Sequence, residues 1–298
     1  MPGEPRVPGG PGRRRPRLND QETQRRMLDA ALAMVHRDGL TVGLDHIGFE
    51  EVIRDAGVSR TAVYRRWPYK DLFFADLLRE LAQGAAPAAA IAEEDTMRLL
   101  ASVVAGRTKE LASPHGRHGL ITEMLRVSAS SDFEAIHDSA EWRTYLALQA
   151  TFLSLPDGDL RDEVQAALAR SEARFVERVA RGWEQIAGAM GYRLRPGSGG
   201  GFTVIATLAG ATMRGLVLMA LSDPELLTRR VSADPTAAGA HADWTLVGLA
   251  AACIATTFLE PDPDVTWDGE RVASLHALLG HDASDQFSAN PDRRPHPG

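Results

Sequence analysis

Cysteine is almost absent from this 298-residue sequence, which contains only Cys253. A single thiol excludes an intrachain disulfide, and it excludes the zinc and iron–sulfur sites that need several thiolates. Long apolar runs are also missing, because Arg214 interrupts residues 203–221 and because residues 244–258 fall short of the roughly 20 residues of a membrane span. No apolar segment follows the N-terminal arginines, so we expect no secretory signal. These absences predict a cytoplasmic protein with no membrane contact and no cofactor.

Sequence patterns of β-strands and of common enzymes are scarce as well. Alternating β-branched and polar residues hardly occur, whereas apolar residues recur at helical spacing along most of the chain, which predicts an all-α fold. The sequence has no Gly-x-Ser-x-Gly elbow and no His-Glu-x-x-His, and the glycine-rich residues 197–201 lack a Walker lysine. His115 and His118 have no third ligand at useful spacing, so we interpret them as surface residues. We therefore expect neither an enzyme nor a metal site.

Negative charge dominates the chain as a whole but not its N-terminal part. The formal net charge is −7. Residues 1–70 contain 13 Lys and Arg against 9 Asp and Glu, whereas residues 71–298 contain 20 against 31. A basic segment on an acidic body is typical of a protein whose one end meets a polyanion such as nucleic acid.

Composition predicts four parts along the chain. Residues 1–18 are rich in proline, glycine and arginine and are expected to form a disordered basic arm. Such an arm either adds contacts to DNA or is only a solubilising tail. Residues 19–82 are predicted to be a small helical domain and residues 90–280 a larger one, joined by an alanine-rich stretch. Residues 282–298 are polar and predict a disordered tail.

Short helices are predicted in the first of these domains. Asn19 begins a capping-box pattern, and the helix that follows it should end at Gly39. A second helix is expected over residues 49–56, and Ser59 should cap a third over residues 60–67. A fourth helix should start near Tyr69, and its predicted apolar face consists of Leu72, Phe73, Leu77, Leu78 and Leu81.

The third helix is predicted to have an apolar back and a polar front. Val63 and Trp67 are four residues apart and should pack inward, which leaves arginine, threonine and tyrosine on the opposite face. Such a helix suits the major groove of DNA, whereas Tyr64 and Lys70 are better placed for phosphates. The candidate DNA-binding residues are Ser59, Arg60, Thr61, Tyr64, Arg65, Trp67, Tyr69 and Lys70. On geometry alone, a solvated basic face between two structural helices explains the same pattern equally well.

The amino-acid sequence around this third helix resembles the N-terminal DNA-binding domain of the TetR family of transcriptional regulators. The resemblance spans about residues 20–82 and is strongest over residues 56–67, AGVSRTAVYRRW. It also rests on Met27, Leu28, Ala30, Ala31, Gly39, Val52, Lys70, Leu72 and Phe73. By position it implies a recognition face of Arg60, Thr61 and Arg65, places Tyr64 on the family's phosphate-contacting tyrosine, and places Lys70 on the lysine that opens the fourth helix. Three departures are the span from Gly39 to Val52, which is a few residues longer than is usual in the family, Gly48, where the family commonly has a capping Ser or Thr, and Ile53, which replaces a small residue.

The resemblance also implies the architecture of the whole chain. It implies an all-helical homodimer, with an N-terminal three-helix helix-turn-helix DNA-binding domain followed by a helical ligand-binding and dimerisation domain. Members of this family are usually repressors that a small molecule releases from a DNA operator. For a two-fold dimer, the operator is expected to be palindromic.

Helical periodicity continues through the second domain. Helices are predicted over residues 96–111, 119–127, 133–153, 160–190, 202–221 and 243–258. The last two, Phe202–Leu221 and Asp243–Phe258, are apolar on nearly every face, so each should be buried on two sides. We expect them to form a homodimer interface with two helices from each subunit, the alternative being two ordinary core helices. Cys253 should then be buried as a small hydrophobic residue.

A small-molecule effector is expected to bind among the helices between residues 96 and 190. Flexible and aromatic side chains are suited to line such a pocket. The candidate ligand-binding residues are Met97, Leu100, Val104, Met124, Leu148, Phe152 and Phe175.

Two hypotheses follow from the sequence. The first is a ligand-responsive homodimeric DNA-binding transcriptional regulator, most simply a repressor released from a palindromic operator by a small molecule. The second is an all-helical small-molecule binding or interaction protein that does not read DNA specifically. The acidic body and the departures at Gly48 and Ile53 motivate the second hypothesis.

Overall fold

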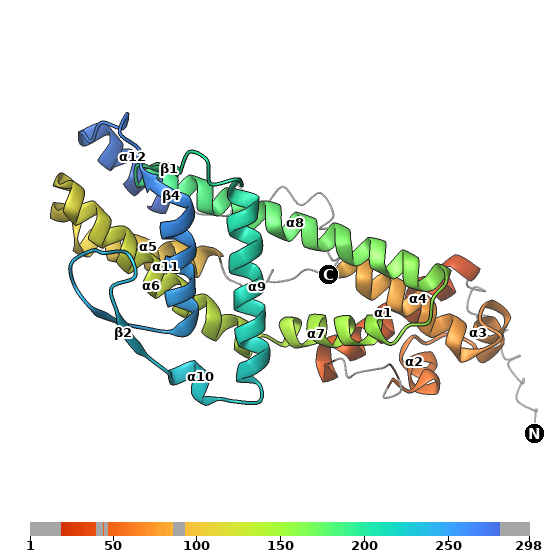
Figure 1. The fold of residues 1–298 in the computed structure, drawn as a ribbon. Coiled ribbons are helices and arrows are strands. Elements are labelled where there is room, and N and C mark those ends of the chain that lie inside the picture. Colours follow the sequence, from red (N-terminus) through yellow and green to blue (C-terminus); the bar gives the residue numbers. More distant parts are fainter. Residues whose placement is uncertain (1–18, 40–43, 45–46, 86–92, 281–298) are drawn as a thin grey trace, which may run out of the picture.

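The computed structural model describes residues 19–39, 44, 47–85 and 93–280. Most of its elements are helices and its four strands have only three residues each, which confirms the predicted all-α class. Figure 1 shows an elongated molecule with α1 to α4 at one end, α5 and α12 at the other, and the long helix α8 running between the two ends. The predicted basic arm, C-terminal tail and most of the interdomain joint lie outside the described residues.

The first four helices form one end of the molecule, which we call the head. They are α1 (Asp20–Asp38), α2 (Phe49–Asp55), α3 (Arg60–Arg66) and α4 (Lys70–Gly84). Both predicted N-caps are present, since the Asn19 side chain accepts from the Glu22 amide at 2.7 Å and the Ser59 hydroxyl accepts from the Ala62 amide at 3.2 Å. Gly57 has a φ of +63°, which glycine adopts without strain and which allows the tight turn between α2 and α3.

An aromatic core holds α3 in place within the head. Val63 is fully buried, and Trp67 is buried with its ring centroid 5.2 Å from that of Phe73. The Trp67 indole N–H donates to a carboxylate oxygen of Asp76 at 3.0 Å, so the ring is both packed and hydrogen-bonded. Leu72 is an exception to the predicted apolar face of α4, because it is 48% exposed. Phe73, one position further along the helix, takes the inward direction instead.

The remaining elements form the body. They are α5 (Glu93–Gly106), the 3-10 helix η1 (Thr108–Ala112), α6 (Pro114–Asp138), α7 (Ala140–Leu153), α8 (Asp159–Ala189), β1 (Tyr192–Leu194), α9 (Phe202–Ala220), α10 (Glu225–Thr228), β2 (Val231–Ala233), β3 (Ala242–Trp244), α11 (Leu246–Phe258), β4 (Leu259–Pro261) and α12 (Gly269–Gly280). In Figure 1, α9 and α11 lie side by side along one face of the body, and the two helices are in contact.

Several predicted boundaries in the body were wrong. One helix, α6, covers residues 114–138, and the break falls at Ser139, whose hydroxyl accepts from the Trp142 amide at 3.2 Å and so starts α7. The helix expected over residues 96–111 ends at Gly106, and the one expected from residue 243 starts after Thr245. The Ser139 and Thr245 side chains cap the starts of α7 and α11, and such local contacts are not reported by hydrophobic periodicity.

Two short antiparallel strand pairs were not expected. In one pair Tyr192 lies opposite Pro261, and in the other Val231 lies opposite Trp244. Each strand has only three residues, which is too short for an alternating pattern to be recognised in the sequence.

The head and the body share a continuous apolar core. Buried Phe73 and Leu77 of α4 belong to the same cluster as Val164 and Leu168 of α8. Polar contacts follow the same junction, since Arg79 of α4 pairs with Glu163 of α8 and the Ser171 hydroxyl donates to a backbone carbonyl at the end of α4. A displacement of α8 therefore has a direct route into the head through packed side chains.

Candidate nucleic-acid interface and ligand cavity

The front of α3 is exposed, as predicted. Arg60, Thr61 and Arg65 are exposed, and Tyr64 is 44% exposed although its ring packs edge-on against Phe49 with centroids 5.9 Å apart. Tyr69 and Lys70, at the start of α4, are exposed beside this face. The structure thus brings these residues together on one surface. Their binding to DNA stays a prediction.

Two of the predicted DNA-binding residues have other roles in this structure. Trp67 is 2% exposed and donates to Asp76, so it supports α3 from behind and is not available to a ligand. The Ser59 hydroxyl is engaged with the Ala62 amide as the helix cap, although Ser59 itself is exposed. The prediction that Trp67 contacts DNA was therefore wrong. Its large aromatic ring packs in the core of the head and is not exposed to a DNA base.

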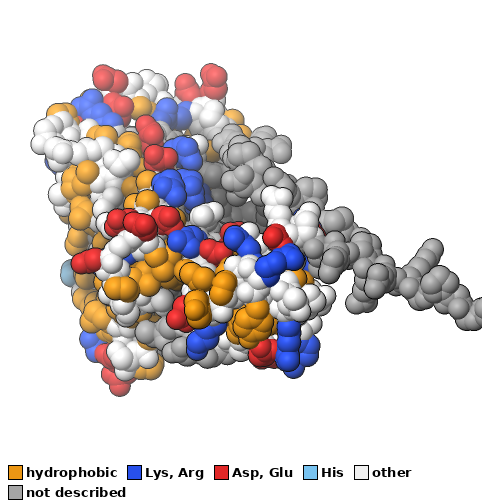
Figure 2. All heavy atoms as spheres, turned by 90° about the vertical axis from the view of Figure 1, so that its right-hand side faces the viewer, with side chains coloured by type: hydrophobic (Ala, Val, Ile, Leu, Met, Phe, Trp, Pro, Cys, Tyr) orange, Lys and Arg blue, Asp and Glu red, His pale blue; other side chains and the backbone are white. Residues whose placement is uncertain are grey.

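Carboxylates from neighbouring helices meet the cations and the phenol of this face. Glu50 of α2 accepts from the Tyr64 hydroxyl at 2.9 Å, and its other oxygen lies 2.7 Å from the Arg60 guanidinium. The hydrogen bond to Glu50 raises the pKa of Tyr64. Asp20 of α1 pairs with Arg65. Figure 2 looks onto this end of the molecule and shows basic and acidic side chains interspersed among apolar ones.

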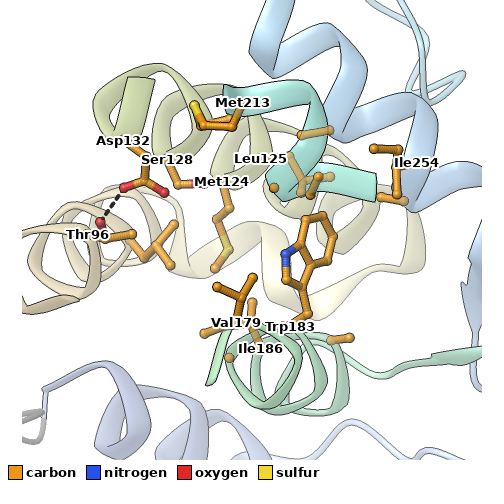
Figure 3. Close-up of a pocket in the computed structure, with 18 of the residues that line it drawn as sticks. Thr96, Met124, Leu125, Ser128, Asp132, Val179, Trp183, Ile186, Met213 and Ile254 are labelled. Carbon is orange, nitrogen blue, oxygen red and sulfur yellow. Dashed lines mark hydrogen bonds between the residues drawn. The ribbon is translucent and has the colours of Figure 1, made fainter. Parts of the chain in front are cut away.

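The body contains a cavity of about 590 Å³ that is lined mainly by α5, α6, α8, α9 and α11, with further residues from α7, β4 and α12. Figure 3 shows Trp183 pointing into it from α8, Met124 from α6 and Met213 from α9. Most of its wall is aliphatic or aromatic, which suits a drug-sized apolar molecule.

The predicted ligand-binding residues divide into two groups. Met97, Leu100, Met124 and Phe175 line the cavity. Val104, Leu148 and Phe152 do not, because Val104 and Leu148 are buried in the surrounding core and Phe152 packs against the core cluster near the head. These three were wrong as cavity residues: helical periodicity identifies an inward side chain but not whether it meets a void or another side chain.

The cavity includes residues that the sequence interpretation missed. Thr96 and Asp132 lie in its wall, and the Thr96 hydroxyl donates to an Asp132 carboxylate oxygen at 2.8 Å (Figure 3). Burial raises the pKa of Asp132 to about 6, and the hydrogen bond from Thr96 opposes that rise. The α9 and α11 helices, expected at a dimer interface, also contribute to the wall through small residues such as Gly210 and Ala251. The one available signal was helical spacing, because Asp132 is three residues after Ala129 and four before Ile136, which are both buried.

The other side of α9 carries an exposed apolar stripe. Its members recur at intervals of four and three residues: Val204, Leu208, Ala211, Gly215 and Leu218, all of them exposed. Leu208 is 42% and Leu218 58% exposed. Cys253 on the adjacent α11 is exposed too in the single chain, so its burial depends on the expected dimer interface and stays a prediction. This spacing is typical of a helix that packs against another helix.

The α9 helix is also long and apolar enough, by composition alone, to cross a membrane. Arg214 in its second half lies 2.9 Å from Glu172 of α8, and the helix packs against both α8 and α11. These contacts are those of a helix within a helical bundle.

The predicted surface position of His118 was wrong. Its Nδ1 lies 2.7 Å from the Tyr192 hydroxyl and its Nε2 lies 2.7 Å from the Thr236 carbonyl oxygen, so both ring nitrogens are engaged inside the body. His115 is exposed. Among the described residues, no three His, Cys, Asp or Glu side chains are grouped so as to hold a metal ion.

No protein-family model and no curated protein matches the sequence. Among solved structures, the chain is similar to SmeT, the repressor of the Stenotrophomonas maltophilia multidrug efflux pump SmeDEF. The identity is 19%, the TM-score is 0.36, and the match covers 83% of this chain and 96% of SmeT. A complex of SmeT with triclosan is similar at 20% identity and a TM-score of 0.37, covering 83% of this chain and 95% of that one. TM-scores this low support no conclusion about function. The proposed function therefore rests on the residues of this chain.

Proposed function

We propose that this chain is a ligand-responsive, homodimeric DNA-binding transcriptional regulator of the TetR family, most simply a cytoplasmic repressor that a small molecule releases from a palindromic operator. The observation that carries the proposal is the exposed front of α3, where Arg60, Thr61, Tyr64 and Arg65 share one face. Buried Val63 and Trp67 hold that face outward. Guanidinium groups on a short exposed helix match the acceptors of the major groove.

Communication from the cavity to the head is proposed to pass along α8. Phe175 on this helix lines the cavity, and Leu168, two turns nearer the head, packs in the core that α8 shares with α4. The Arg79–Glu163 pair links the same two helices close to the DNA-binding end. A ligand that moves α8 would therefore move α4 and change the position of α3.

The homodimer is proposed to form through α9 and α11. The apolar stripe that begins at Val204 and ends at Leu218 gives a second copy a surface with the spacing of helix–helix packing. A two-fold axis beside these helices would present two α3 helices to one face of the DNA, which is the arrangement that reads a palindrome. A protein of this kind has no catalytic role, and we propose none.

The DNA-binding proposal can be tested by mobility shift on DNA that flanks its own gene. Replacing Tyr64 and Lys70 together by alanine should weaken binding to all sequences about tenfold or more, because both side chains are proposed to hold phosphates. The slope of log Kd against log salt should fall by about 2, one for each lysine of the dimer. Arg60→Ala should weaken binding and also relax sequence preference.

Lys109→Ala is the matched control, since Lys109 is the other lysine of the chain and is exposed on η1 in the body. It should leave both affinity and salt slope unchanged. Full binding by the Tyr64→Ala, Lys70→Ala variant, with its helical circular dichroism intact, would reject this docking surface.

A second candidate function is a ligand-binding protein that does not read DNA. The specific observation in its favour is that Glu50 and Asp20 already pair with Arg60 and Arg65. Selection from random-sequence DNA distinguishes the two functions. Enrichment of a palindrome supports the regulator, and recovery of no preferred sequence supports the second function.

Glu50→Gln provides a further test of the same face. The substitution removes one negative charge beside Arg60 and Tyr64, so we expect DNA affinity to rise about three- to tenfold, most strongly at low salt. Glu51→Gln is the control, because Glu51 is exposed on the same helix but pairs with Arg54. Equal affinities for the two variants and the unmodified protein would show that Glu50 does not oppose DNA.

A further inference from the structure

Asp132 is an isolated carboxylate in the wall of an apolar cavity. Of the described residues that line the cavity, only Asp132 and Arg178 carry ionisable side chains. Asp132 is surrounded by protein yet keeps part of its surface accessible, because it faces the cavity. Its one hydrogen-bond donor in the described structure is the Thr96 hydroxyl, and no basic side chain of the described residues forms an ion pair with it.

A carboxylate in such surroundings is costly unless something compensates its charge. The nearby basic side chains on the packed helices have partners elsewhere: Arg126 pairs with Glu123, and Arg214 pairs with Glu172. The guanidinium of Arg178 lies over the ring of Phe175, 5.7 Å from its centroid. A neutral hydroxyl such as that of Thr96 offsets only part of the cost of burial. The cation that would complete this site is therefore absent from the described side chains.

The rest of the wall suits the organic part of such a cation. Figure 3 places the indole of Trp183 and the thioether of Met124 in the cavity with Asp132 at one end. Aromatic faces attract cations as well as apolar rings, and methionine adapts to irregular ligands. The polarity of the cavity is thus uneven: Asp132 is the one acidic residue among the described residues of its wall, the guanidinium of Arg178 lies over the Phe175 ring, and most of the remaining wall is apolar.

We propose that the cavity binds an amphipathic organic cation, whose aromatic body lies against Trp183 and Met124 and whose protonated amine pairs with Asp132. The inference rests on the proposed function, because it names the chemical class of the effector. A neutral ligand that only donates a hydroxyl hydrogen bond to Asp132 is the competing outcome. A ligand that carries a carboxylate is disfavoured at this end of the cavity, because the negative charge of Asp132 would repel it.

Three anthracene probes of nearly equal shape test the proposal on the full-length protein. They are 9-(aminomethyl)anthracene, which is cationic at pH 7.5, neutral 9-anthracenemethanol and anionic 9-anthracenecarboxylate. Binding is measured without DNA by calorimetry and by quenching of tryptophan fluorescence. The amine should bind at least about tenfold more tightly than the alcohol, and the carboxylate should bind most weakly.

Asp132→Asn should weaken the amine about tenfold or more and leave the affinity for the alcohol within about threefold, because only the charge is removed. Glu134→Gln removes a charge from the exposed face of the same helix and should change neither affinity. The proposal is overturned if amine and alcohol bind equally, if neither binds, or if Asp132→Asn leaves amine binding unchanged.

Failure of this inference remains distinguishable from failure of the regulator proposal. Palindrome selection and mobility shift use the ligand-free protein, whereas the anthracene measurements use no DNA. Specific DNA binding without amine preference would reject only the cation. Amine preference without specific DNA binding would reject only the regulator.

Discussion

Replacing Leu208 and Leu218 together by glutamate is expected to convert the protein from a dimer to a monomer. Both side chains belong to the exposed stripe of α9. A symmetric dimer would bury both leucines of each subunit, which makes four buried side chains. Burial of a leucine contributes roughly 1.5–3 kcal/mol, so losing four such contacts should cost at least about 5 kcal/mol of association free energy. The dimer dissociation constant should rise more than a thousandfold. Sedimentation velocity over a range of concentrations measures this directly.

Leu153→Glu is the matched control for this experiment. Leu153 is 75% exposed at the end of α7, outside the proposed interface, so the substitution adds charge without removing a dimer contact. It should leave the dimer intact. The α9 variant should also lose palindrome binding, because a monomer carries one α3 helix. A dimer of unchanged affinity in the α9 variant, with normal helical content, would contradict the assignment of the interface.

Asp132→Asn is expected to stabilise the ligand-free protein at neutral pH but not in acid. The pKa of Asp132 is about 6 when folded against an ordinary value of 3.8, so the folded state holds the proton more tightly than the unfolded chain. The carboxylate therefore costs almost nothing below pH 3.8, its destabilising effect grows between pH 3.8 and about 6, and the effect is constant above that range. The full difference corresponds to about 3 kcal/mol. Asparagine keeps a hydrogen-bond acceptor for Thr96 and carries no charge.

Urea unfolding of both proteins at pH 4 and pH 7.5 measures the effect. The gain in free energy of unfolding for Asp132→Asn should be below about 1 kcal/mol at pH 4 and about 2–3 kcal/mol at pH 7.5. Glu134→Gln should show no such pH dependence, because Glu134 is exposed. If Asp132→Asn raised the free energy of unfolding by the same amount at both pH values, burial of the charged carboxylate would not be the cause. A stability cost of this size at a cavity wall is typical of a binding site.

Local sequence was sufficient to predict the head. Two of its helices begin with a side-chain cap, Asn19 for α1 and Ser59 for α3, and the tight turn between α2 and α3 depends on Gly57. All of these signals act within a few residues of the chain, so they can be recognised without knowledge of the fold. The four-residue spacing of Val63 and Trp67 was likewise enough to orient α3.

Tertiary contacts decided the roles of the body helices and of individual charges. Apolar residues on nearly every side of α9 predicted two buried sides, yet one side lines a cavity and the other is an exposed stripe in the single chain. Val104 and Met124 look alike as inward positions, but only Met124 meets the void. The ion pair between Glu50 and Arg60, across the turn between α2 and α3, could not be predicted from the sequence either.

The order of residues along the chain determined which segments are helical, where the head begins and which face of α3 is exposed, because hydrogen bonds and periodicity within a helix are local. Only the packed structure decided that Asp132 lies at a cavity, since a void is bounded by residues from helices far apart in sequence. Its raised pKa follows from those same surroundings, because desolvation depends on everything packed around a group and not on its neighbours in the chain.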